Sequence, residues 1–209
     1  MTPTETDLLL IIDVQNDFCP GGALAVTEGD RIVPIINNLI PKFSNIALTQ
    51  DWHPAGHSSF ATSHPGHDPF TTIAMPYGEQ TLWPDHCIQG SRGAQFHDAL
   101  NTDPASIVIR KGYNPAVDSY SAFYENDHKT STGLGGFLRD RKIQQIFCVG
   151  LALDYCVFYS ARDAIKESFK ATVITDACRA IDMDGSAEKA IDEMTKNGIS
   201  LIESNALLA

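Results

Sequence analysis

The sequence predicts an α/β protein with three layers, in which helices cover both faces of a mainly parallel, doubly wound sheet of six strands. Two observations lead to this prediction. Short apolar runs alternate along the chain with segments of helical periodicity, and the apolar runs are continuous rather than interrupted by polar residues. The chain has 209 residues, of which 43% are hydrophobic and 20% are charged, so it can build one large core. We therefore expect a single domain over residues 1–209.

Six apolar runs are expected to form the strands. In chain order they are residues 8–13, 45–50, 106–111, 145–151, 171–176 and 199–203. Helices are expected where apolar residues recur at three- and four-residue spacing. These segments are residues 32–43, 154–169 and about 187–196, and Gly198 ends the last of them.

Two long segments show no sustained periodicity. Residues 51 to about 100 are rich in Gly, Pro and His, and residues 112–132 form a second irregular stretch. An irregular segment as long as the first is usually functional when it lies inside a compact domain, so we expect an insertion there that serves the site. It holds six of the seven histidines, which are His53, His57, His64, His67, His86 and His97. We expect His64, His67, His97 and His128 to lie on the surface or in loops.

The charge balance and the apolar runs exclude several classes of partner. The chain has 15 Lys and Arg against 26 Asp and Glu, a formal net charge of −11, which would be repelled by a nucleic acid. The longest apolar run, Leu8–Ile12, is too short to span a bilayer, and the first residues carry no basic, apolar signal segment. Five cysteines without a CxxC pair argue against a disulfide framework. We expect a soluble, cytoplasmic protein that binds neither nucleic acid nor membranes.

Reactive side chains follow the ends of four predicted strands. Asp13, Asp51 with His53, Lys111, and Cys156 each lie at or shortly after such an end. In open parallel sheets, ligands bind beyond the carboxyl ends of the strands. We therefore expect these side chains to meet at one rim of the sheet.

Cys156 is the candidate nucleophile. It lies in the first turn of a predicted helix, where the helix dipole lowers the pKa of a thiol and favours the thiolate. Asp13 would be the general base, Lys111 would keep that carboxylate ionised, and the turn before Cys156 offers backbone N–H groups to an oxyanion. The alternative is that Cys156 is a small buried residue, Asp13 a strand-end cap and Lys111 a solvated base.

A second cluster has the residue types of a metal site. Asp51 and His53 lie two residues apart on extended chain and so point to the same side, and His86 supplies a third ligand. Two histidines and one carboxylate with open positions suit Zn²⁺, Fe²⁺ or Mn²⁺. His57 would either bind the metal directly or support another ligand. The alternative is a loop held together by histidine hydrogen bonds.

Taken together, these residues resemble the nicotinamidase branch of the isochorismatase-like cysteine hydrolases. The resemblance covers nearly the whole chain. It rests on DVQNDF (13–18), DWHPAGH (51–57), WPDHC (83–87), KG (111–112), DSYSAF (118–123) and GLALDYCV (150–157). The two histidine-bearing segments are the more specific, because relatives such as the isochorismatases lack the metal.

The resemblance implies the isochorismatase-like form of the fold and a catalytic triad of Asp13, Lys111 and Cys156. It implies an oxyanion hole formed by the backbone N–H groups of Ala152 and Cys156, with a cis peptide bond between Leu151 and Ala152. One departure is visible at Leu153, where the family often has a small polar residue.

The resemblance also implies the ligands of the site. Asp51, His53 and His86 would hold one divalent metal, with zinc first and iron or manganese as alternatives. Phe18 and Trp83 match the residues that hold a pyridine ring, and Tyr120 would line the same pocket. Without the resemblance, Phe18 and Trp83 would be interpreted as ordinary core aromatics.

The implied activity is the hydrolysis of nicotinamide to nicotinate and ammonia, as in NAD salvage, through a thioester on Cys156. Pyrazinamide-like analogues would be further substrates, and a homo-oligomer is compatible with the family. Three alternatives remain open. They are a metal-free relative that acts on another small amide or a vinyl ether, a non-haem iron oxygenase, and a metal-binding protein without catalysis.

Overall fold

Six parallel strands form the central sheet of the computed structural model, which describes residues 1–208. In chain order the strands are β1 (Asp7–Ile12), β2 (Asn45–Asp51), β5 (Ile107–Lys111), β6 (Gln145–Leu151), β7 (Lys170–Arg179) and β8 (Ser200–Ile202). Their order across the sheet is β5-β2-β1-β6-β7-β8, and every neighbouring pair is parallel. The chain therefore winds outward in both directions from β1, which confirms the predicted doubly wound sheet.

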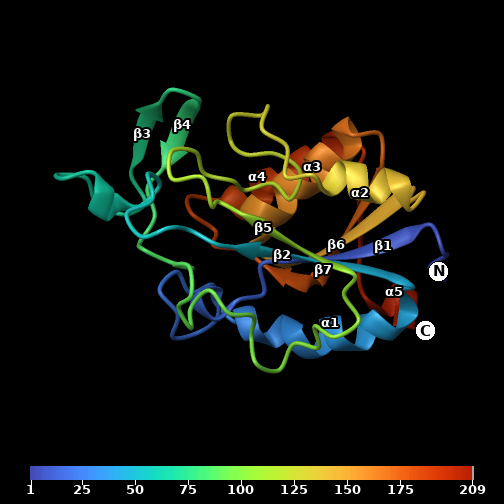
Figure 1. The fold of residues 1–209 in the computed structure, drawn as a ribbon. Coiled ribbons are helices and arrows are strands. Elements are labelled where there is room, and N and C mark those ends of the chain that lie inside the picture. Colours follow the sequence, from blue (N-terminus) through green and yellow to red (C-terminus); the bar gives the residue numbers. More distant parts are fainter. Residues whose placement is uncertain (209) are drawn as a thin grey trace.

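Helices cover both faces of this sheet, as Figure 1 shows. One face carries α1 (Val33–Leu39) and α5 (Asn205–Leu208), and the other carries α2 (Leu134–Asp140), α3 (Phe158–Lys166) and α4 (Ser186–Lys196). The three predicted layers are thus present. None of the helices within residues 1–208 is long and apolar enough to cross a membrane.

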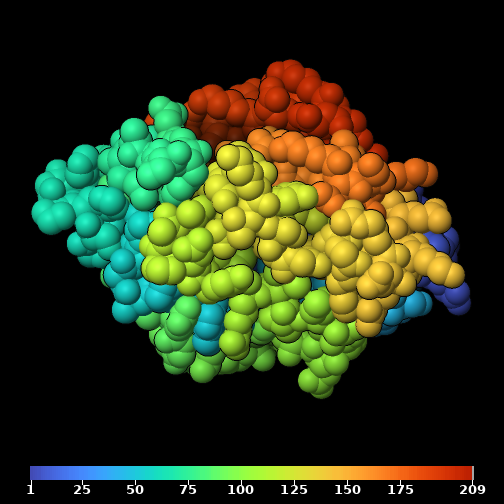
Figure 2. Space-filling view, turned by 45° about the horizontal axis from the view of Figure 1, so that its top comes forward, coloured from blue at the N-terminus to red at the C-terminus, as the bar shows by residue number. Residues whose placement is uncertain are grey.

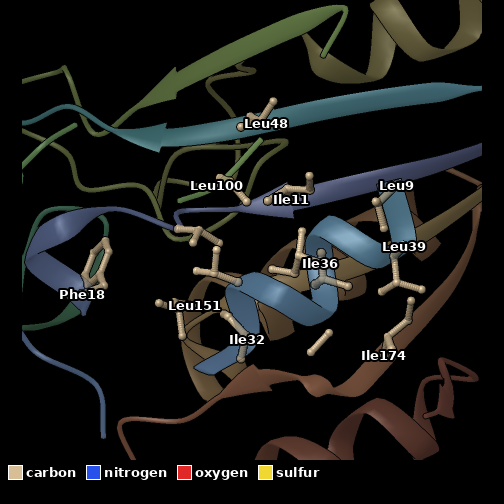
Figure 3. Close-up of a cluster of buried hydrophobic side chains, with 14 of the residues drawn as sticks. Leu9, Ile11, Phe18, Ile32, Ile36, Leu39, Leu48, Leu100, Leu151 and Ile174 are labelled. Atoms are coloured by element: carbon tan, nitrogen blue, oxygen red, sulfur yellow. The ribbon is translucent and has the colours of Figure 1, made fainter. Parts of the chain in front are cut away.

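The continuous apolar runs are explained by burial on both sides of the sheet. In β1, Leu9 and Ile11 belong to the core cluster on the α1 side, and Leu8 and Leu10 belong to the cluster under α2 and α3. Successive strand residues point to opposite faces, so a strand covered on both sides has no place for a polar residue. Figure 3 shows side chains of α1, including Ile36, packed against this part of the sheet.

Two helices differ from their predicted extents. The first is interrupted near Pro41: α1 ends at Leu39 and a short 3-10 turn continues to Lys42, because proline has no N–H for the helical ladder. The second does not begin as an α-helix, since Leu153–Val157 form a π-helical turn before α3. The helix α2 was not predicted, because Gly135 and Gly136 give its sequence a weak helix propensity.

A hairpin inside residues 51–100 was not predicted either. Its strands, β3 (Thr72–Met75) and β4 (Gly78–Thr81), are antiparallel. Apart from Gln80, their residues are exposed or half-buried, so the strands lack a strong apolar alternation. In Figure 1 the hairpin projects beyond the carboxyl ends of β2 and β5. Residues 112–132 lie beside it, as the yellow-green segment of Figure 2 shows. The two segments without periodicity therefore come together at the rim where a ligand site is expected.

Candidate active site

A small pocket lies at the carboxyl ends of the central strands. Its lining residues are Phe18, Leu24, Asp51, Trp83, His86, Asp118, Tyr120, Ala152, Tyr155, Cys156 and Ile181. The wall is mainly aromatic and aliphatic, with carboxylates, an imidazole and a thiol among these groups. Such a pocket suits a small, flat molecule with a few polar atoms.

The ammonium group of Lys111 is the centre of the reactive cluster. Its Nζ lies 2.8 Å from Asp13 Oδ2 and 3.5 Å from Cys156 Sγ, and it also contacts the Asp51 carboxylate. It donates a further hydrogen bond of 2.9 Å to the carbonyl of Ser119. Lys111 is only 1% exposed, so it is not a solvated base. The parallel register explains the meeting, because β1, β5 and β6 all end at the same rim.

Burial and charge set the protonation states of this cluster. Burial raises the pKa of Asp13 to about 6, with Lys111 opposing the shift and Asp51 adding to it. Burial alone would lower the pKa of Lys111, but the charges of Asp13 and Asp51 raise it well above its usual value. Asp13 is thus a base whose pKa lies near neutrality, beside a permanently charged ammonium.

The expectation of a lowered thiol pKa at Cys156 is wrong for this structure. Burial raises the pKa of Cys156 well above its usual value, Lys111 lowers it, and Asp13 and Asp51 raise it further. The residue also lies in a π-helical turn rather than in the first turn of an α-helix. The resting group is therefore a thiol, and its proton must move to a base before the sulfur can attack.

The turn that carries Cys156 has a fixed geometry. The carbonyl of Ala152 accepts hydrogen bonds from the N–H groups of Tyr155 and Val157, each at 3.1 Å. The peptide bond between Leu151 and Ala152 is cis, which confirms the expectation drawn from the resemblance. Leu153 is 8% exposed, packs in the core cluster beneath α2 and α3, and does not line the pocket. Its departure from the family pattern therefore leaves the pocket wall unchanged.

Asp51, His53 and His86 form a set of converging ligands. Nε2 of His53 lies 3.7 Å and Nε2 of His86 lies 3.8 Å from Asp51 Oδ2. Nδ1 of His53 is bound to the carbonyl of Gly112, and Nδ1 of His86 to the carbonyl of Pro84, each at 2.8 Å. A carbonyl can only accept, so each Nδ1 carries the proton and each Nε2 offers its lone pair toward Asp51. This arrangement fits a metal.

The hydrogen bond between His53 and the carbonyl of residue 112 requires glycine at that position. The φ of Gly112 is +65°, and a Cβ atom there would lie 2.4 Å from Cε1 and 2.6 Å from Nδ1 of His53. Only glycine therefore allows the backbone carbonyl to approach the imidazole closely enough to fix its tautomer.

His57 lies beside the ligand set but is engaged elsewhere. Its Nδ1 lies 2.7 Å from Ser59 Oγ and its Nε2 lies 2.8 Å from the carbonyl of Asn114. Its ring packs at 4.5 Å from that of His53. Both nitrogens of His57 thus have partners, and the ring supports His53 by packing.

The charges around the pocket also favour a divalent cation. Three buried carboxylates, Asp13, Asp51 and Asp118, stand against the single ammonium of Lys111, a formal surplus of two negative charges with the histidines neutral. Burial would lower the pKa of His53, but the adjacent carboxylate of Asp51 and the charge of Asp118 raise it. An ion of charge +2 at this position would neutralise the surplus.

The sequence-predicted residues are brought together almost completely. Phe18, Trp83 and Tyr120 line the pocket with Cys156, as expected. Asp118 was missed as a buried, pocket-lining carboxylate, although it opens one of the segments that carry the resemblance. Gln80 behind the pocket wall was also missed. Nothing in the local pattern distinguishes it from an exposed hairpin residue.

Comparisons with known proteins show the family of the chain. A family model described as the isochorismatase domain matches residues 7–206. The chain is 50% identical to a nicotinamidase of Acinetobacter baylyi, over 96% of this chain and 94% of the relative, and 45% identical to the nicotinamidase of Escherichia coli, over 92% of each.

Solved structures give the same result. The nicotinamidase and pyrazinamidase of Acinetobacter baumanii superposes with a TM-score of 0.97 at 50% identity, covering 98% of this chain and 99% of that one. PnC1 from L. infantum in complex with nicotinate superposes with a TM-score of 0.87 at 39% sequence identity, covering 99% of this chain and 98% of that one. The pyrazinamidase of Pyrococcus horikoshii in complex with zinc superposes with a TM-score of 0.78 at 34% sequence identity, covering 95% of this chain and 99% of that one. The chain therefore belongs to the isochorismatase domain family and, within it, to the branch that contains the nicotinamidases.

Proposed function

We propose that this chain is a nicotinamidase, a cysteine amidohydrolase that converts nicotinamide and water to nicotinate and ammonia in NAD salvage. The observation that carries the proposal is the meeting of a buried thiol, carboxylate and ammonium with a converging ligand set at one small aromatic pocket. The names of the relatives support the same reaction. We also propose that residues 1–209 act as one amidohydrolase domain, in which residues 51 to about 100 are a metal-binding insertion.

The acylation half-reaction uses Asp13 as a proton carrier. Asp13 accepts the thiol proton of Cys156, and the sulfur attacks the carboxamide carbon to form a tetrahedral oxyanion. The backbone N–H groups of Ala152 and Cys156 donate hydrogen bonds to this oxyanion. Asp13 then gives its proton to the departing nitrogen, so ammonia leaves and a thioester remains on Cys156. Lys111 stays protonated and stabilises the negative charge that passes between Asp13 and the sulfur.

The deacylation half-reaction reverses these transfers. Asp13 accepts a proton from water, the resulting hydroxide attacks the thioester, and the same N–H groups hold the second oxyanion. Collapse releases nicotinic acid, whose carboxyl proton passes to the released ammonia in water to give nicotinate, and the thiolate of Cys156 recovers its proton from Asp13. Atoms balance, because one water is consumed and one ammonia is released in each cycle.

We propose that Asp51, His53 and His86 hold one divalent ion, which is zinc. The zinc complex of the Pyrococcus horikoshii relative supports this choice. When bound, the ion supplies a Lewis-acid position for the pyridine nitrogen of the substrate. Phe18 and Trp83 are proposed to hold the two faces of the pyridine ring, and Tyr120 completes the wall.

Ammonia release from nicotinamide, measured beside the elemental content of the protein as purified, tests the proposal. Turnover with about one metal ion per chain is the expected result. Turnover of another small amide by a metal-free protein would favour the metal-free relative, and a metal-loaded protein without turnover would favour a binding role. An iron oxygenase would have no use for Cys156 and would retain its activity in Cys156→Ala.

Alanine variants of the ligand set should differ in metal content. Asp51→Ala, His53→Ala and His86→Ala are each expected to lose stoichiometric metal, because a site with three protein ligands cannot spare one. His57→Ala should weaken metal binding by roughly 10–100-fold, since it supports a ligand from behind. Metal content after dialysis against a graded series of chelator measures the difference. If His57→Ala empties the site as completely as His53→Ala does, His57 is a direct ligand.

Benzamide should be a poor substrate because it has the shape of nicotinamide without the ring nitrogen. Sites built around a polar partner reject an analogue that lacks it, so we expect kcat/KM to be at least ~10²-fold lower for benzamide. His86→Ala should reduce this ratio by impairing nicotinamide far more than benzamide. Measuring kcat/KM for both amides with both proteins checks this. An equal loss for the two amides would show that the metal activates water or maintains the structure instead.

A further inference from the structure

We propose that Gln80, on strand β4 of the hairpin, is a positioning residue that sets substrate affinity by holding the pocket wall from behind. This inference rests on the proposed function. Gln80 is completely buried, although the strand around it is largely exposed. Its Nε2 lies 3.0 Å from Asp118 Oδ2 and 2.9 Å from the hydroxyl of Tyr120, and both of those residues line the pocket.

The carboxamide of Gln80 has only one orientation that satisfies its neighbours. The backbone N–H of Tyr120 donates to Oδ1 of Asn126 at 3.0 Å, so the Nδ2 of Asn126 is the atom that faces Gln80. Oε1 of Gln80 must therefore accept from that Nδ2, and it also accepts from the hydroxyl of Tyr77, both at 3.2 Å. The Nε2 of Gln80 is thereby directed at three acceptors that share its two hydrogens, namely Asp118 Oδ2, the hydroxyl of Tyr120 and, at 2.7 Å, the carbonyl of Thr81.

This orientation determines the role of the Tyr120 hydroxyl. The indole Nε1 of Trp83 can only donate, and it lies 3.2 Å from the same hydroxyl. The hydroxyl oxygen thus faces the donors of both Gln80 and Trp83. Gln80, which lies outside the pocket, contacts two groups of its wall directly, the carboxylate of Asp118 and the phenol of Tyr120, and reaches the indole of Trp83 through that phenol. The hydrogen bonds of Gln80 within residues 1–208 involve none of Asp13, Lys111 and Cys156.

The first test separates binding from chemistry with Gln80→Leu, which keeps an apolar bulk of similar size but removes every hydrogen bond. We expect KM for nicotinamide to rise by about tenfold or more, and kcat to change by less than about threefold. The Kd for nicotinamide in the Cys156→Ala background should rise by the same factor as KM. Partial unfolding alone would lower kcat and leave KM unchanged, so it gives the opposite pattern. Glu79→Gln, an exposed neighbour on the same strand, is the matched control and should equal the unmodified protein.

The second test uses Gln80→Glu, which keeps the shape of the side chain. Burial and the neighbouring Asp118 both disfavour a charged group there, so the introduced carboxyl should titrate above its ordinary pKa. When it is protonated it can donate one hydrogen bond to Asp118 or Tyr120, and when it is ionised it can donate none and repels Asp118. The KM of this variant relative to the unmodified enzyme should therefore increase as the pH rises. A ratio that is constant with pH would contradict the positioning role.

A third readout needs no turnover. The chain has two tryptophans, Trp52 and Trp83. The fluorescence emission of Trp83 is therefore the difference between the spectrum of a protein and the spectrum of the same protein carrying Trp83→Phe. This emission should shift in Gln80→Leu and stay unchanged in Glu79→Gln. If the unmodified protein does not hydrolyse nicotinamide, the proposed function fails and the Trp83 emission alone decides the role of Gln80. An unchanged emission in Gln80→Leu overturns the inference, and so does an unchanged KM in an enzyme that hydrolyses nicotinamide.

Discussion

Replacing Cys156 by alanine is expected to lower kcat/KM for nicotinamide by at least ~10⁴-fold while leaving the fold intact. The sulfur lies at the pocket wall, 3.5 Å from the Lys111 ammonium, and alanine leaves no atom that can form the acyl intermediate. The substitution removes one small buried atom, so the thermal unfolding midpoint should change little. Steady-state ammonia release and thermal denaturation measure the two quantities.

Cys19→Ala is the matched control for this variant. Cys19 is also buried, but it lies outside the pocket lined by Cys156. We expect it to retain kcat/KM within a few-fold. Mass spectrometry of quenched unmodified enzyme should locate a nicotinoyl adduct on the peptide that contains Cys156. An adduct on Cys19 or Cys87, or an active Cys156→Ala protein, would contradict the assignment of the nucleophile.

Replacing Asp13 by asparagine should have the second largest effect. Because the thiol of Cys156 is protonated at rest, its attack requires a base. A carboxylate oxygen of Asp13 lies within 4.8 Å of the sulfur, and Asp13 Oδ2 is 2.8 Å from the Lys111 ammonium. Positioned general bases contribute about 10²–10⁴-fold, so we expect kcat/KM to fall by roughly 10³-fold or more. Asparagine keeps the shape and the hydrogen bond from Thr49 Oγ1, so substrate binding should be retained. Rates of ammonia release and the Kd for nicotinamide in the two proteins check this.

The pH dependence gives a further signature of Asp13. Its pKa is raised to about 6, and the base acts only when it is deprotonated, so kcat/KM of the unmodified enzyme should decline as the pH falls through about 6. Asp13→Asn has no such group, and its residual rate should lack that decline. Asp7→Asn is the control, since Asp7 is a buried carboxylate at the opposite end of β1 and should leave the profile unchanged. A profile of Asp13→Asn that matches the unmodified enzyme would exclude Asp13 as the base.

The order of elements and the residues at the strand ends were predictable because they depend on local pattern. Continuous apolar runs such as Leu8–Ile12 indicate strands buried on both faces, and parallel strands place their carboxyl ends at one rim. The sequence alone therefore predicts that Asp13, Lys111 and Cys156 lie at one rim of the sheet. The hairpin and α2 could not be predicted, because exposed strands and glycine-rich turns leave little periodicity to detect.

The sequence by itself determined the fold class, the rim at which the reactive residues meet and the residue types of the ligand set. Only the tertiary structure decided the protonation state of Cys156, which is set by burial and by the carboxylates of Asp13 and Asp51. It also decided that both nitrogens of His57 are engaged elsewhere, and that Gln80 is buried behind the pocket. The physical reason is the same in each case. A pKa, a tautomer and a buried hydrogen bond depend on groups that are distant in the chain and adjacent only after folding, and no local pattern records them.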